Sequence, residues 1–122
     1  MLQEVIFIKK MIVTDLDGTL LNSSHKVSSL SKTYLSDLKE KGYVIVLATG
    51  RVLKSALGAT DGALFADYII SDNGSVIYEV ESGKIIFEVG IDKRDARKII
   101  DFYDDSVNYI EICDYYAYNI YT

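Results

Sequence analysis

The chain has 122 residues, which is enough for one modest domain with a hydrophobic core. Hydrophobic residues make up 49% of it and charged residues 25%, a balance typical of a globular domain and not of a disordered chain. The formal net charge is −5, with the whole acidic excess in residues 62–122, so the composition argues against a nucleic-acid partner.

The sequence also argues against disulfides and membrane segments. The single cysteine, Cys113, excludes an intrachain disulfide and fits a reducing compartment. Every apolar run is far shorter than the roughly 20 residues of a membrane-spanning helix. The run "VIFI" at 5–8 is too short for a signal-peptide core, and its lysines follow it instead of preceding it. We therefore expect a cytoplasmic protein with no membrane partner.

Three apolar runs in the first part of the chain predict strands. Residues 10–15 and 43–50 are continuous, β-branched and apolar on both faces, and a shorter run lies within 66–74. Because helical patterns separate these runs, they favour a parallel α/β sheet. Ligands of such sheets bind beyond the carboxyl ends of the strands.

Two helices are expected between these strands, over 27–42 and 51–59. In the first, Ser28 is a suitable N-cap and Gly42 a suitable residue just past the C-terminus. The apolar face of this helix is predicted from residues spaced by three or four positions, namely Val27, Leu30, Tyr34 and Leu38.

The pattern changes near 71–74, where we place a boundary between residues 1–71 and residues 72–122. The change of pattern coincides with the shift in charge. The second unit is expected to be β-rich and to contain three pieces: an antiparallel hairpin over 75–91, a helix over 92–105 with Asp92 as its N-cap, and two strands over 108–122 around a turn near Asp114.

Two carboxylates stand at the end of the first predicted strand. Asp15 and Asp17 are two positions apart, with the backbone groups of Leu16 between them and Gly18 following. A carboxylate in such a position can attack a phosphoryl group and form an aspartyl-phosphate, and a second one can serve as general acid and then base. Mg²⁺ would neutralise the negative charge where the carboxylate approaches the phosphoryl group. The alternative is a plain turn, because Asp-x-Asp-Gly is good turn chemistry.

A second polar group stands at the end of the next predicted strand. The hydroxyl of Thr49 and the N–H groups of Gly50 and Arg51, at the start of a helix, would form an anion site. The alternative is an ordinary helix start with Thr49 as its cap. The pair Asn73–Gly74, after the third strand, is interpreted as an ordinary turn.

Three segments carry a family resemblance. "DLDGTLLN" at 15–22 and "VIVLATGR" at 44–51 closely resemble the haloacid dehalogenase-like (HAD) superfamily, and "DYIISDNGSVIYE" at 67–79 resembles its Cof-type branch. The resemblance implies an α/β fold in which 1–71 forms the first three strands of a Rossmann-like core. It also implies that an inserted α+β lid begins within 72–122.

The resemblance also implies roles for individual residues. Asp15 would be the nucleophile and a Mg²⁺ ligand, and Asp17 would be the general acid/base and a Mg²⁺ ligand through its carbonyl. Phosphate binding would fall to the backbone of Leu16 and to Thr49, Gly50 and Arg51, the last of these near the substrate or the lid.

The expected function is that of a Mg²⁺-dependent phosphatase acting on a small phosphorylated metabolite, for example a sugar phosphate. The family completes its site with a lysine and a second acidic cluster that follow the lid. Because this chain stops at Thr122, within lid-like sequence, we expect it to be truncated and to have little or no turnover. Two alternatives stay open: a phosphotransferase or mutase with the same intermediate, and a non-catalytic module. Such a module would self-associate through an open sheet edge or an incomplete lid, or pair with a complementing partner.

Overall fold

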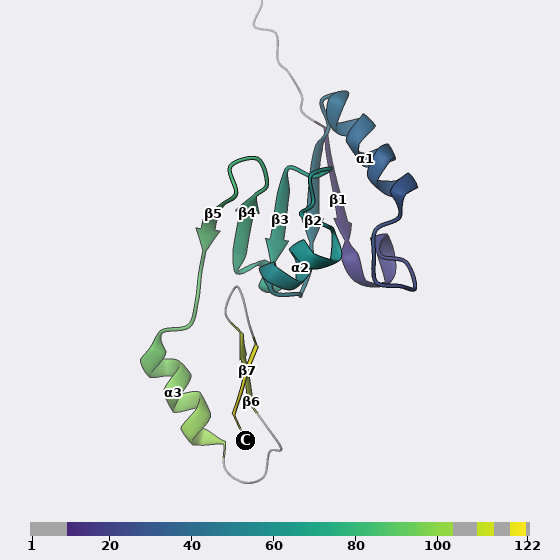
Figure 1. Ribbon diagram of the computed structural model, residues 1–122. Helices are drawn as coiled ribbons and strands as arrows, with labels where there is room; N and C mark the ends of the chain where they lie inside the picture. The colour runs from purple at the N-terminus through teal and green to yellow at the C-terminus, as the bar shows by residue number, and fades with distance from the viewer. Residues whose placement is uncertain (1–9, 104–109, 114–117, 122) are drawn as a thin grey trace, which may run out of the picture.

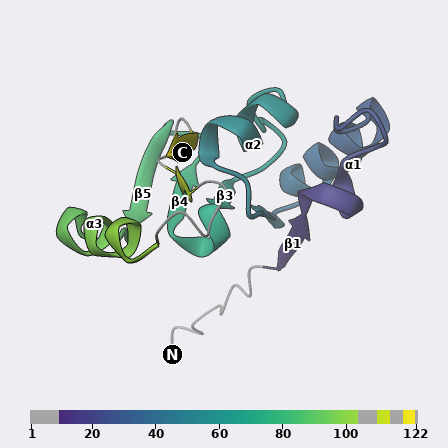
Figure 2. The same ribbon diagram turned by 90° about the horizontal axis from the view of Figure 1, so that it is seen from below.

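The structure is a computed structural model that describes residues 10–103, 110–113 and 118–121 (Figure 1). Its main feature is a five-stranded sheet in the order β1-β2-β3-β4-β5, and a two-stranded sheet pairs β6 with β7. Helices α1 and α2 lie on the same face of the large sheet, as the view along the strands shows (Figure 2). No helix among the described residues combines the length and the apolar composition needed to cross a membrane.

The first three strands confirm the predicted parallel arrangement. Strands β1 (Met11–Asp15), β2 (Val44–Ala48) and β3 (Tyr68–Ser71) are parallel, and α1 (Ser29–Glu40) and α2 (Leu53–Ala59) connect them. In the register of the first pair, the last residue of β1 lies opposite the last residue of β2. The two polar strand ends singled out in the sequence therefore meet at one edge of the sheet.

The hairpin after β3 pairs differently from what the sequence suggests. Strands β4 (Val76–Glu79) and β5 (Lys84–Glu88) are antiparallel, but β4 also pairs with β3 and extends the large sheet. The reason is the short turn at Asp72–Gly74, which reverses the chain at once and returns it alongside β3. The fold is thus a mixed sheet, and the division of the chain near 71–74 into core and lid stays a prediction.

The last described elements match the predicted order. Helix α3 (Lys93–Phe102) begins at Asp92, whose carboxylate accepts a hydrogen bond of 2.8 Å from the N–H of Arg94. Strands β6 (Ile110–Cys113) and β7 (Tyr118–Tyr121) form an antiparallel pair. The predicted turn near Asp114 lies outside the described residues.

The core lies between the large sheet and its two helices. Four leucines and isoleucines are fully buried there, one from the turn after β1, two from β2 and one from β3, namely Leu16, Ile45, Leu47 and Ile69. Helix α2 contributes its small and branched side chains to the same cluster, namely Leu53, Ala56 and Ala59. Burial of this apolar surface holds the parallel strands in register beneath the polar strand ends.

The predicted apolar face of α1 is wrong at Leu30 and Tyr34 and confirmed at Leu38. Leu30 and Tyr34 are 75% and 67% exposed, whereas Leu35 and Leu38 pack against the core. Val27 is buried, but it precedes the helix and therefore does not mark the helical face. Counting the periodicity from this loop residue shifted the expected face around the helix axis.

The ends of α1 agree with the sequence. The hydroxyl of Ser28 accepts a hydrogen bond of 3.1 Å from the N–H of Ser31, as an N-cap does. Gly42 follows the helix with a φ of 87°, in the left-handed region that glycine adopts without steric cost. These two residues fix where the helix begins and ends, and so where β2 can start.

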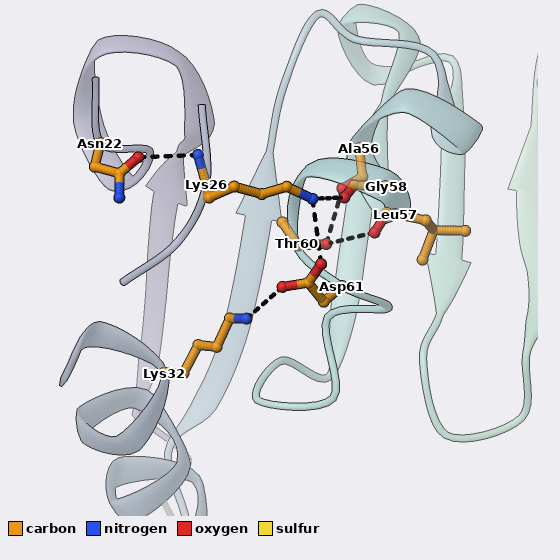
Figure 3. A network of polar contacts seen from close by, with 8 residues as sticks. All are labelled: Asn22, Lys26, Lys32, Ala56, Leu57, Gly58, Thr60 and Asp61. Atoms are coloured by element: carbon orange, nitrogen blue, oxygen red, sulfur yellow. Dashed lines mark hydrogen bonds and ion pairs between the residues drawn. The ribbon is translucent and has the colours of Figure 1, made fainter. Parts of the chain in front are cut away.

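A polar clamp ties the loop after β1 to the end of α2 (Figure 3). The ammonium group of Lys26 lies 2.6 Å from the carbonyl oxygen of Gly58 and 3.2 Å from one carboxylate oxygen of Asp61. Lys32, on α1, lies 2.6 Å from the other oxygen. The hydrogen bond from Lys32 and then that from Lys26 lower the pKa of Asp61. The clamp therefore joins three segments through one ionised carboxylate.

Asp61→Asn is expected to lower the melting temperature at neutral pH by a small amount, because the clamp is exposed to solvent. The folded-state pKa of Asp61 is depressed, so its stabilising effect is present above the unfolded-state pKa and is lost as the pH falls through the folded-state value. Thermal unfolding should therefore show a difference at pH 7 that vanishes in strong acid. A difference that persists in acid would contradict the electrostatic account.

Candidate active site

Asp15 ends β1 with its carboxylate exposed. One carboxylate oxygen accepts a hydrogen bond of 2.7 Å from the N–H of Leu16. The side chain of Leu16 turns the other way and is fully buried in the core. The N–H of Leu21 closes the following turn on the carbonyl of Leu16 at 2.9 Å, and Gly18 supplies a φ of 73° within it. A buried anchor thus holds the two acidic side chains of this turn at the surface.

Asp17 forms a two-point ion pair with Arg51. The Nε and Nη2 atoms of Arg51 lie 2.6 and 2.7 Å from the two carboxylate oxygens of Asp17. The guanidinium fork matches a carboxylate in this geometry, and charge-assisted bonds of this kind are the stronger ones. Hydrogen bonding to Arg51 lowers the pKa of Asp17, although burial acts in the opposite direction. The pair connects the two predicted halves of the site.

The loop after β2 holds the other predicted phosphate ligands. Thr49 is buried, and its N–H donates to the carbonyl of Ile70 on β3 at 2.9 Å. Its hydroxyl oxygen accepts a 3.1 Å hydrogen bond from the N–H of Arg51, which leaves the hydroxyl hydrogen to donate elsewhere. Helix α2 begins only at Leu53, so Gly50 and Arg51 lie in a loop before the helix and not at its first turn.

The turn after β3 belongs to this edge as well. A Cβ atom on Gly50 would lie 2.8 Å from the side-chain oxygen of Asn73. The N–H groups of Asp72 and Asn73 both donate to carbonyls of the loop after β2. Sequence reasoning treated Asn73–Gly74 as an ordinary turn and missed this contact. The signal available was a run of turn residues directly after a buried strand in a parallel sheet.

A shallow depression of about 440 Å³ adjoins these two loops. It offers room for a small organic group beside the strand ends, and much of its wall is apolar. Its lining combines the loop residues Gly50, Asp72, Asn73 and Ser75 with Val89, Gly90, Ile91 and Cys113.

The donors at this edge fit part of a Mg²⁺ shell. Mg²⁺ binds hard oxygen ligands, commonly one or two carboxylates completed by water and phosphate oxygens. Asp15 supplies an exposed carboxylate at the strand end. Arg51 contacts both carboxylate oxygens of Asp17, so the carboxylate of Asp17 is already engaged. The backbone carbonyl of Asp17 is therefore the group of this residue that would serve as a second metal ligand. Among the described residues no group of three or more His, Cys, Asp or Glu side chains converges on one point.

Comparison with known proteins decides the family. The family model described as haloacid dehalogenase-like hydrolase matches residues 12–122, which is almost the whole chain.

The chain belongs to the haloacid dehalogenase-like hydrolase family.

Three relatives within this family illustrate the match. Phosphatase YwpJ of Bacillus subtilis is 34% identical over 103 residues, covering 84% of this chain and 36% of its own. The structure of BT1666 from Bacteroides thetaiotaomicron, studied among phosphatases of the HAD superfamily, is 34% identical with a TM-score of 0.65 and covers 78% of this chain and 35% of its own. A haloacid dehalogenase-like hydrolase from B. subtilis is 36% identical with a TM-score of 0.66 and covers 76% and 32%. The chain therefore spans about a third of the length of these relatives.

Arg51→Ala is expected to raise the pKa of Asp17 towards its ordinary value, because the largest cause of its depression is the hydrogen bond from Arg51. Arg51→Lys is the matched control, since it keeps the positive charge without the fork and should raise the pKa less. Carboxyl chemical shifts followed through an NMR pH titration measure both. An unchanged pKa of Asp17 in Arg51→Ala would show that the ion pair does not form in solution.

Proposed function

We propose that this chain carries the phosphoryl-transfer part of a Mg²⁺-dependent phosphatase of the Cof type, acting on small phosphomonoesters through an aspartyl-phosphate. The observation that carries the proposal is the meeting of Asp15 and Asp17 with the Thr49–Arg51 loop at the carboxyl ends of two paired parallel strands. This is where α/β sheets of this kind bind their ligands.

In the proposed reaction a carboxylate oxygen of Asp15 attacks phosphorus, and the bond from phosphorus to the leaving alcohol oxygen breaks. Asp17 gives its proton to that oxygen. In the second step Asp17 takes a proton from water, which attacks the phosphorus of the aspartyl-phosphate and releases inorganic phosphate and free Asp15. Bound Mg²⁺ would neutralise the negative charge that gathers at the phosphoryl group.

The ion pair between Asp17 and Arg51 bears on the first of these steps. A general acid must hold a proton, whereas Arg51 stabilises the ionised carboxylate of Asp17. The guanidinium also lies at the edge where a phosphate would arrive. We therefore expect the arriving phosphate to draw Arg51 away from Asp17, so that one arginine serves both anions in turn.

The names of the relatives support the reaction class. Phosphatase YwpJ of B. subtilis and the HMP-PP phosphatase of Yersinia pestis are 34% and 29% identical to this chain. The depression of about 440 Å³ adjoins the proposed phosphate-binding loop at Gly50. The identity of the metabolite and the cytoplasmic location stay predictions from the sequence.

The direct test is turnover of p-nitrophenyl phosphate by the longest natural protein that contains this chain. Turnover should require Mg²⁺, disappear with EDTA and return when Mg²⁺ is added in excess. The metal dependence follows from the need to neutralise charge between a carboxylate and a phosphate. Full turnover in EDTA would refute the proposed mechanism.

A second candidate, self-association, rests on a separate observation. Within the described part of the chain β1 is an edge strand that pairs only with β2, and its Met11 and Val13 side chains are 61% and 56% exposed. An exposed apolar edge strand is a template for pairing with another chain. Light scattering on the 122-residue chain tests this, since a monomer at high concentration would count against it.

A further inference from the structure

The turn after β3 has an unusual backbone. Asp72, Asn73 and Gly74 have φ values of 52°, 55° and 97°, so three successive residues are left-handed. Residues other than glycine rarely adopt this conformation, and Asp and Asn tolerate it best. Two of them in succession indicate that the surrounding contacts determine the backbone here.

Those contacts are with the loop after β2. The N–H of Asp72 donates to the carbonyl of Arg51 at 2.9 Å, and the N–H of Asn73 donates to the carbonyl of Thr49 at 3.3 Å. The turn is itself closed by Ser75, whose N–H and hydroxyl both donate to the carbonyl of Asp72, at 3.3 and 3.0 Å. The left-handed turn therefore binds two carbonyls of the neighbouring loop.

This binding determines the direction of an N–H group. In a trans peptide the carbonyl and the following N–H point in opposite directions within one plane. Because the carbonyl of Thr49 points at the turn, the N–H of Gly50 points away from it. The turn thus aims the N–H group that the family resemblance assigns to phosphate binding.

Gly50 supports the same conclusion. Its φ is not left-handed, so conformational freedom does not explain a glycine at this position. A Cβ there would lie 2.8 Å from the side-chain oxygen of Asn73 and 3.5 Å from its amide carbon. The glycine is explained by the close approach of the Asn73 side chain, which packs on the loop, while the backbone N–H of Asn73 donates to the loop carbonyl of Thr49.

We propose that the Asp72–Asn73–Gly74 turn holds the Thr49–Arg51 loop in the shape that receives the phosphoryl group, with Asn73 as the positioning residue. This inference rests on the proposed phosphatase function. Asn73 acts through the loop and takes no part in the chemistry. It should therefore affect phosphate binding more than the rate of the bound complex.

The test compares two replacements of Asn73 in the longest natural protein that contains this chain. Asn73→Gly tolerates the left-handed backbone, whereas Asn73→Val does not, because a β-branched residue clashes there. Asp61→Val is the matched control, since Asp61 has a φ of 52° but bonds to Lys26 and Lys32 and not to the loop.

With p-nitrophenyl phosphate as substrate, Asn73→Val should raise KM by about tenfold, because small misplacements of binding groups are costly. The inhibition constant of inorganic phosphate should rise in parallel, and kcat should change much less. Asn73→Gly should recover most of the loss, and Asp61→Val should keep the KM of the wild type. If the wild type is active and Asn73→Val matches it, the positioning role is overturned while the phosphatase function stands.

Amide hydrogen exchange in the 122-residue chain tests the positioning role of Asn73 separately from the phosphatase function. Asn73→Val should speed exchange at the N–H groups of Arg51 and Asp72, and leave the buried strand β2 unchanged. Unchanged exchange at Arg51 and Asp72 would overturn the positioning role. Absence of Mg²⁺-dependent turnover in the wild type, with the exchange result as expected, would instead count against the phosphatase function.

Discussion

Asp15→Asn should reduce turnover of p-nitrophenyl phosphate by about a thousandfold or more, since the loss of a nucleophile removes the covalent route itself. Asparagine keeps the size and the hydrogen-bonding oxygen of Asp15, so the bond from the N–H of Leu16 can persist. The variant should therefore fold normally and lose catalytic activity. Steady-state kinetics in the longest natural protein that contains the chain measure the loss.

Asp37→Asn serves as the control for this experiment. Asp37 is an exposed carboxylate on α1, and the same chemical change there should leave turnover within the error of the assay. Circular dichroism establishes that both variants are folded. Substantial activity in Asp15→Asn would exclude this residue as the nucleophile and, with it, the proposed aspartyl-phosphate.

Leu16→Ala should lower the free energy of unfolding by about 2–5 kcal/mol, the usual cost of truncating a fully buried leucine. Leu16 is 0% exposed and belongs to the core cluster with Ile45, Leu47 and Ile69. Part of the cost is lost apolar burial and part is the cavity that rigid strands cannot close. Urea denaturation followed by circular dichroism measures the change.

Two control variants sharpen this prediction. Leu30→Ala removes the same atoms from a side chain that is mostly exposed, and should change stability by no more than about 0.5 kcal/mol. Leu16→Met conserves volume and should cost less than about 1.5 kcal/mol. Equal effects of Leu16→Ala and Leu30→Ala would contradict the burial assigned to Leu16.

The position of Leu16 links stability to chemistry. Its side chain is the buried member of a short turn whose neighbours on either side, Asp15 and Asp17, point outward. Any repacking around Leu16 would move both carboxylates relative to the Thr49–Arg51 loop. Core variants at this position are therefore expected to lose activity before they unfold.

The local features of the molecule could be predicted because short-range patterns specify them. Continuous apolar runs gave the parallel strands, and the caps at Ser28 and Asp92 lie where the sequence places them. The two acidic residues at the end of β1 and the polar group after β2 were identified because parallel strands end at a common edge. Their roles in phosphate and metal binding stay predictions.

Other features depend on which surfaces meet, and the sequence pattern did not specify them. Leu30 and Tyr34 were wrongly placed on the apolar face of α1 because the apolar repeat was counted from Val27, a loop residue whose burial comes from tertiary contacts. The hairpin β4–β5 was predicted, but the pairing of β4 with β3, which follows from the short turn between them, was not. The alternation of apolar and polar residues indicates that a strand is half-buried, but it does not indicate which strand is its neighbour in the sheet.

The sequence by itself determined the order of the elements, the N-caps of α1 and α3 and the presence of an acidic pair at a strand end, because each depends on residues within a few positions of one another. Only the tertiary structure decided that Arg51 pairs with Asp17 and that Asn73 packs on Gly50. These contacts join residues that are distant in the chain, and they form because the crossovers through α1 and α2 return successive strand ends to one edge of the sheet.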